Sequence, residues 1–182
     1  MLFDKITIIG IGLIGSSLAR VIMKKGLAGK LCACDKNKEY LAEARELGIV
    51  DEISEDLGKA VENADLVVYA TPVGAYGEIT RQIVPHLKKG VILTDVGSIK
   101  KYSIREIEEN LPENADVVVV PGHPVAGTEK SGPANGFDTL FEGRWYIVTP
   151  SSRSTEEAVA KVSELWAAAR MKVDKMTPEH HD

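Results

Sequence analysis

The sequence predicts a doubly wound α/β fold, in which helices cover both faces of a mainly parallel sheet. Three observations support this prediction. Apolar, β-branched runs alternate with segments of helical periodicity along most of the 182 residues. The runs are nearly all apolar, as expected of strands that are buried on both faces. The first run also ends in a glycine-rich turn that opens a helix.

The first third of the sequence gives two strand–helix pairs and a further short helix. Lys5–Ile9 is a β-branched run, and Leu13–Lys25 has apolar residues at helical spacing, followed by Gly26 as a stop signal. The same signals predict a strand at Leu31–Asp35 and helices at Lys38–Leu47 and Leu57–Asn63.

The alternation continues to residue 120. Asp65–Ala70 is a buried strand, because every residue after the aspartate is apolar. The next predicted elements are a helix at Ala75–Leu87, a strand at Val91–Asp95, a helix at Ile99–Asn110 and a strand at Asp116–Val120.

A long Gly- and Pro-bearing loop, Pro121–Arg144, then breaks the pattern. Loops of this length are usually functional or disordered. The alternation resumes after it with a strand at Trp145–Thr149, a helix at Ser154–Arg170 and a strand at Met171–Lys175. We therefore expect residues 1–175 to form one Rossmann domain.

Composition narrows the function class. The net charge of −5 supplies no basic field for a nucleic-acid backbone, so a small-molecule partner is expected instead of nucleic acid. The start of the chain lacks a signal-peptide pattern and no apolar run is long enough to cross a membrane, which predicts a cytoplasmic protein without membrane contact. Cys32 and Cys34 are expected to be buried free thiols, and no metal site is predicted.

Three glycines follow the first predicted strand in the pattern Gly-x-Gly-x-x-Gly. The first glycine permits a tight turn, the second lets the backbone approach a pyrophosphate, and the third lets helix and strand pack closely. Plain turns also contain such spacing, but its place between a strand and a helix favours dinucleotide binding. The candidate cofactor residues in this turn are Gly10, Ile11, Gly12, Leu13, Ile14 and Gly15.

Asp35 ends the second predicted strand, where a carboxylate can bind both ribose hydroxyls of a dinucleotide. A negative charge there repels the 2′-phosphate of NADP, so NAD is the favoured cofactor. Lys36 is a cation that can rescue NADP binding, which keeps NADP open as the less favoured cofactor. The candidate cofactor site also includes Thr71, Pro72, Val73 and Ser98.

Two segments, the one that holds Ser98 and the one that holds His123, directly follow predicted strands. They therefore lie where the carboxyl edge of the sheet faces the cofactor crevice. His123 lies in the long loop and is the candidate acid–base group, because a histidine pKa lies close to the working pH. Ser98 either caps the next helix or orients His123 or the nicotinamide. His86 lies near a predicted helix C-terminus, so a structural role is favoured for it.

The motifs GIGLIGSSLA, DVGSIK and GHPVAGTEKSG, in this order, resemble the prephenate and arogenate dehydrogenase family over essentially the whole chain. The resemblance implies oxidative decarboxylation of prephenate to 4-hydroxyphenylpyruvate, or of arogenate to tyrosine, with reduction of NAD in tyrosine biosynthesis. It further implies that His123 takes the proton of the ring hydroxyl, that Ser98 supports it, and that Thr128 and Glu129 line the substrate pocket.

Family members continue into a helical domain that supplies dimer contacts and part of the pocket. Residues 176–182 are expected to begin the connection to that domain, which is absent here, so the role of His181 and Asp182 is hypothetical. The chain alone is expected to bind NAD with little activity, and the full-length protein to be a homodimer. The alternatives are a related Rossmann oxidoreductase of hydroxy acids or imines, and an NAD-binding sensor or structural module without catalysis.

Overall fold

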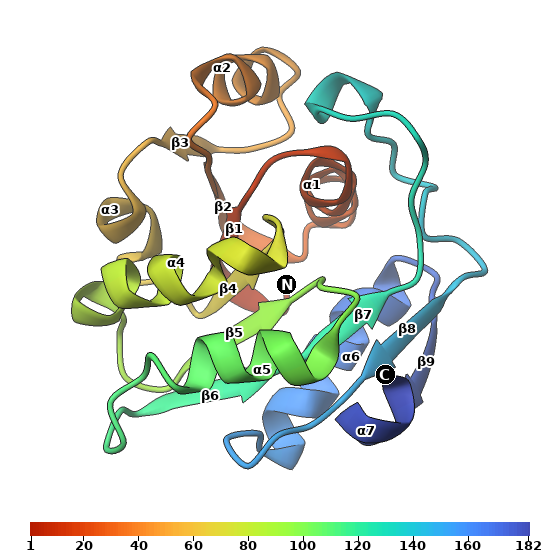
Figure 1. Cartoon of the computed structure of the whole chain (residues 1–182). Coiled ribbons are helices and arrows are strands. Elements are labelled where there is room, and N and C mark those ends of the chain that lie inside the picture. Colours follow the sequence, from red (N-terminus) through yellow and green to blue (C-terminus); the bar gives the residue numbers. More distant parts are fainter.

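The computed structural model describes residues 1–182 and contains two sheets (Figure 1). The larger sheet has six parallel strands in the order β3-β2-β1-β4-β5-β6, so the strand order reverses between β1 and β4. The doubly wound fold is therefore confirmed. Its strands are β1 (Phe3–Ile9), β2 (Ala28–Cys34), β3 (Glu52–Ser54), β4 (Leu66–Tyr69), β5 (Val91–Asp95) and β6 (Val117–Val120).

Helices cover both faces of this sheet (Figure 1). The apolar sides of α1 (Leu13–Lys25), α2 (Lys38–Glu46) and α6 (Glu156–Ala168) pack into one core. Those of α3 (Leu57–Val61), α4 (Tyr76–Ile83) and α5 (Lys100–Glu108) pack into a second core on the opposite face. Burial on both faces explains why the strands β4 to β6 are almost entirely apolar.

The helix predicted at Ala75–Leu87 is interrupted. The α-helical part is α4, and short 3₁₀ segments, η1 (Val73–Ala75) and η2 (Val84–His86), flank it. Pro85 accounts for the end of α4, because proline has no backbone N–H with which to continue the helical hydrogen bonds. No helix in the structure is both long and apolar enough to span a bilayer.

A small second sheet follows the Rossmann strands. In it β7 (Gly122–Pro124) runs antiparallel to β8 (Trp145–Val148), which runs parallel to β9 (Lys172–Lys175). The strand β7 was not predicted, and the expectation that His123 lies in a loop was wrong: it is paired with Ile147. A three-residue strand of Gly, His and Pro has no hydrophobic period to reveal it.

Most of the long predicted loop remains irregular, with a 3₁₀ turn η3 (Pro133–Asn135) in it. The loop is attached to α1 by a hydrogen bond, in which the amide of Phe137 donates to Ser17 Oγ at 3.1 Å. The chain then ends in the short helix α7 (Pro178–His181). Pro178 occupies its first turn, where proline is favoured because its missing amide would have no partner within the helix.

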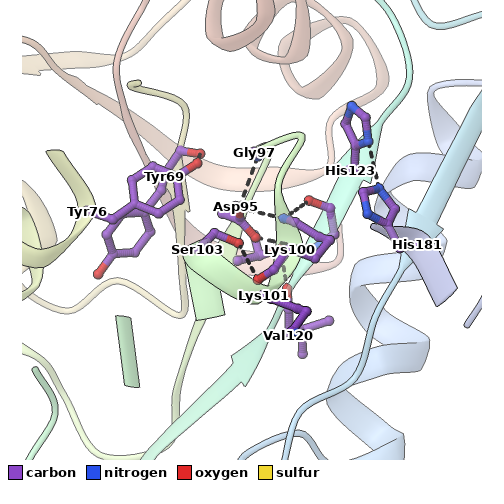
Figure 2. A network of polar contacts seen from close by, with 12 residues as sticks. Tyr69, Tyr76, Asp95, Gly97, Lys100, Lys101, Ser103, Val120, His123 and His181 are labelled. Atoms are coloured by element: carbon purple, nitrogen blue, oxygen red, sulfur yellow. Dashed lines mark hydrogen bonds and ion pairs between the residues drawn. The ribbon is translucent and has the colours of Figure 1, made fainter. Parts of the chain in front are cut away.

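A buried ion pair joins the two sheets (Figure 2). Lys100 Nζ lies 2.6 Å from Asp95 Oδ2, and both side chains are 0% exposed. Gly122, the first residue of β7, is held from both sides: its amide donates to Asp95 Oδ1 at 3.2 Å, and its carbonyl accepts from Lys100 Nζ at 2.6 Å. The pair thus fixes β7 against the end of β5.

Replacing Lys100 by methionine should lower the free energy of unfolding by roughly 3–5 kcal/mol, because it leaves the buried Asp95 carboxylate without its cation. Urea denaturation of the 182-residue chain measures this. The matched control is Lys101→Met, since the side chain of Lys101 is exposed and only its amide is used; we expect a change within about 0.5 kcal/mol. Equal stabilities of the two variants would contradict the role given to the pair.

Candidate functional site

A cleft of about 730 Å³ opens at the carboxyl ends of β1, β2 and β4. This is where the strand order reverses, the position at which doubly wound sheets bind ligands. The cleft brings together six of the residues singled out in the sequence: Gly10, Gly12, Asp35, Lys36, Thr71 and Pro72.

Each glycine of the fingerprint meets a different steric constraint. Gly10 has a φ of +96°, and a Cβ there would lie 2.6 Å from the carbonyl oxygen of Ala70. A Cβ on Gly15 would lie 2.0 Å from the carbonyl oxygen of Gly10, so this helix position permits only hydrogen. A Cβ on Gly12 meets nothing within 4 Å, although Gly12 lines the cleft. That open face, at the start of α1, suits a diphosphate that approaches the backbone.

Asp35 braces the glycine turn. Its Oδ2 accepts from the amide of Ile11 at 2.8 Å, and its Oδ1 accepts from the amide of Asn37 at the same distance. Each carboxylate oxygen can accept a second hydrogen bond, so the group can still receive ribose hydroxyls. Lys36 is exposed at the cleft rim.

The other candidate cofactor residues do not line the cleft. Ile11 is fully buried, and Leu13 and Ile14 pack against the core. Their side chains therefore anchor the glycine turn to the core. Val73 lies in η1 and packs against the second core.

Sequence reasoning missed several residues that do line the cleft. Tyr40 of α2 and Gln82 of α4 are the largest polar examples, and Asn37 also lies there. Only the position of Asn37 and Tyr40 shortly after Asp35 could have pointed to them.

Cys34 lines the cleft as well, and burial raises the pKa of its thiol to about 12. Cys32 is likewise buried. The interpretation of both cysteines as buried free thiols is confirmed.

His123 lies three residues beyond the end of β6, at the carboxyl edge of the same sheet. Its Nδ1 lies 3.0 Å from Nε2 of His181, and Figure 2 shows the two rings next to each other beside the Asp95–Lys100 pair. Partial burial, helped by the nearby charge of Lys100, lowers the pKa of His123 to about 4. The imidazole is therefore neutral at pH 7 and able to accept a proton.

His181 and Asp182 form the part of this cluster that sequence reasoning left without a role. The Asp182 carboxylate accepts from the amides of Lys100 and Lys101, at 2.9 and 3.0 Å, and from His181 Nδ1 at 2.8 Å. Asp182 therefore caps α5, whose N-cap residue Ile99 offers no side-chain cap. The contact spans more than 80 residues, so no local signal could reveal it.

Ser98 is exposed and makes no side-chain hydrogen bond. Its predicted alternative role as the cap of α5 is wrong, because Asp182 fills that position, and the partner of His123 Nδ1 is His181. Thr128 and Glu129 are exposed on the loop beyond β7, where Thr128 Oγ1 accepts from the amide of Lys130. His86 is exposed in η2, outside both the cleft and this cluster.

Comparison with known proteins gives a consistent result. Residues 18–175 match the prephenate dehydrogenase nucleotide-binding domain family. The chain is 38% identical over 180 residues to a cyclohexadienyl dehydrogenase of Zymomonas mobilis, covering 99% of this chain and 60% of that protein. It superimposes on the prephenate dehydrogenase of A. aeolicus, crystallised with hydroxyphenyl propionate and NAD⁺, with a TM-score of 0.88 at 31% identity, covering 98% of this chain and 61% of that one.

An arogenate dehydrogenase of Synechocystis gives the same TM-score of 0.88 at 28% identity, covering 97% of this chain and 61% of that one. The chain therefore spans about three fifths of the length of these relatives. The match to a nucleotide-binding domain family agrees with the cleft described above. The chain belongs to the prephenate dehydrogenase family, as its nucleotide-binding domain.

Proposed function

We propose that this chain is the NAD-binding portion of a prephenate dehydrogenase, in which His123 is the proton acceptor. The observation that carries the proposal is the placement of His123: a neutral imidazole at the carboxyl edge of the sheet whose glycine cleft fits a dinucleotide. The relatives of the chain are named for dehydrogenation of prephenate, arogenate or a cyclohexadienyl compound.

Different cleft residues would hold different parts of the dinucleotide. The open face of Gly12 and the amides at the start of α1 would receive the diphosphate, and Asp35 would receive the ribose hydroxyls. A negative charge at Asp35 favours NAD over NADP. Bound NAD supplies the hydride acceptor for the oxidation.

His123 would act on the ring hydroxyl of the substrate. As the carbon that bears this hydroxyl is oxidised, the imidazole takes the hydroxyl proton. The bond to the ring carboxylate then breaks and carbon dioxide leaves. Its electron pair completes the aromatic ring and turns the new carbonyl into a phenolate, which takes back the proton held by His123. Partial burial and, after it, the charge of Lys100 lower the pKa of His123, so the imidazole is neutral and can accept the proton when substrate binds.

Ser98, Thr128 and Glu129 stay candidates for substrate contacts, because all three are exposed on segments that leave the carboxyl edge of the sheet. Arogenate is the second candidate substrate, favoured by the similarity to the Synechocystis arogenate dehydrogenase. NADH formation by the full-length protein with each substrate separates the two, and no NADH with either would favour a non-catalytic NAD-binding role. The homodimer and the place in tyrosine biosynthesis stay predictions.

Gly12→Ala should weaken NAD binding by about tenfold or more while leaving the unfolding midpoint unchanged, because the new methyl group enters only the open face of the cleft. Isothermal titration calorimetry and thermal unfolding of this chain measure the two effects. Gly15→Ala is the contrast: its methyl group would collide with the backbone of Gly10, so it should destabilise the fold. Unchanged NAD affinity in folded Gly12→Ala would argue against this cleft as the cofactor site.

Asp35→Asn keeps the shape of the side chain that braces the glycine turn and removes its charge. The preference for NAD over NADP should fall by about tenfold, since the charge no longer repels a 2′-phosphate. Dissociation constants for both cofactors test this, with Glu39→Gln, an exposed α2 variant outside the cleft, as the control. A preserved ratio of the two constants would remove Asp35 from cofactor selection.

His123→Asn in the full-length protein should lower kcat by about 10²- to 10⁴-fold, the usual contribution of a general base, and leave the affinity for NAD nearly unchanged. The pH dependence of kcat/KM provides a second readout. Because His123 must be neutral to accept a proton and its pKa is lowered to about 4, activity should persist at pH 5.5 to 6.5 and fall as the pH approaches about 4. Normal turnover of the variant would exclude this role.

A further inference from the structure

We propose that His181 and Asp182 are positioning residues that fix the tautomer of His123, so that its Nε2 carries the free lone pair. The inference rests on the proposed function, in which His123 accepts a proton. It follows from a chain of two hydrogen bonds that ends on a carboxylate, running from Asp182 through His181 to His123 (Figure 2).

The first step is the bond between Asp182 and His181. Asp182 Oδ1 lies 2.8 Å from His181 Nδ1. Burial acts to raise the pKa of the Asp182 carboxyl, but the hydrogen bonds from the Lys101 and Lys100 amides and from His181 outweigh it and hold the pKa below its ordinary value. An ionised carboxylate only accepts hydrogen bonds, so the proton of this bond must sit on His181 Nδ1.

The second step is the bond between the two histidines. A neutral histidine with its proton on Nδ1 has an unprotonated Nε2, which can only accept. His181 Nε2 lies 3.0 Å from His123 Nδ1, so beside a neutral His181 the donor is His123, with its proton on Nδ1. The Nε2 of His123 is then unprotonated, as a general base requires.

The position of His181 is set by α7, and α7 is tied to the start of α5. Asp182 accepts from both amides at the start of α5, the helix whose first residue is Lys100. The side chain of His181 is only 7% exposed, and its ring meets that of His123 edge to face, with centroids 5.2 Å apart. The His181 ring is therefore held by burial as well as by its hydrogen bonds to Asp182 and His123.

A positively charged His181 would reverse the second bond, because both of its nitrogens would then donate. His123 would have to accept at Nδ1 and hold its proton on Nε2, where it could not act as a base. The charged groups that face the two rings are Lys100, Asp95 and Asp182. The two alternatives differ in which nitrogen of His123 carries the proton, so they can be told apart directly.

The test is nitrogen NMR of this chain with ¹⁵N-labelled histidine, because long-range couplings to the ring carbons' protons show which nitrogen is protonated. At pH 7 we expect the proton of both His123 and His181 on Nδ1. A proton on Nε2 of His123 in the unaltered chain would overturn the proposal. This measurement needs no variant and no enzymatic activity.

Variants identify the cause. His181→Phe keeps a ring but removes the acceptor, and should change the tautomer ratio of His123 about fivefold or more towards the Nε2–H form, the effect of losing one ordinary hydrogen bond. His181→Gln retains an acceptor and should restore the ratio. The matched control is His180→Phe, since the side chain of His180 is exposed and makes no hydrogen bond. An unchanged ratio in His181→Phe would also overturn the proposal.

The same variants in the full-length protein separate the two hypotheses. If His181 positions the base, His181→Phe should lower kcat with KM for NAD unchanged, and His181→Gln should recover part of the loss. A full-length protein that forms no NADH while the tautomer result holds would refute the proposed function and leave the positioning role intact. Activity with an unchanged tautomer ratio in His181→Phe would refute only the positioning role.

Discussion

The arrangement of the second half of the molecule depends on the buried ion pair of Asp95 and Lys100. Removing two charges from water costs several kcal/mol for each ion, and only a full set of hydrogen bonds offsets that cost. The set is present: the carboxylate also accepts from the amides of Gly97 and Gly122, and the ammonium group also donates to the carbonyl of Gly122. Because Gly122 begins β7, satisfying the buried charges also determines where the next residue, His123, lies.

The same pair contributes to the chemistry of that histidine. Partial burial is the main reason that the pKa of His123 is low, and the positive charge of Lys100 is the next. Asp95 acts in the opposite direction, but its carboxylate is already committed to Lys100 and to two backbone amides. Lys100, which is needed for packing, therefore also contributes to lowering the pKa of the proposed base, His123.

The sequence predicted the elements whose causes lie in consecutive residues. The helix α1 spans Leu13–Lys25 as predicted, because its apolar spacing and the left-handed Gly26 that ends it are both written in consecutive residues. The strand β7 and the bond between His123 and His181 could not be predicted in this way, because they depend on segments far apart in the chain. The resemblance of GHPVAGTEKSG directed attention to His123 and gave the supporting position to Ser98, which the structure leaves exposed and without a side-chain hydrogen bond.

The site divides between two parts of the sequence. The cleft is lined entirely by residues 9–82, and the histidine cluster comes from segments after β5. The two parts meet at Gly97, where a Cβ would lie 2.8 Å from Asp95 Oδ2 and 3.0 Å from Cγ2 of Val73. Any side chain there would have to displace either the buried carboxylate or the η1 segment behind the cleft. The glycine of DVGS thus serves a packing constraint that couples the position of the proposed base to the wall of the cofactor cleft.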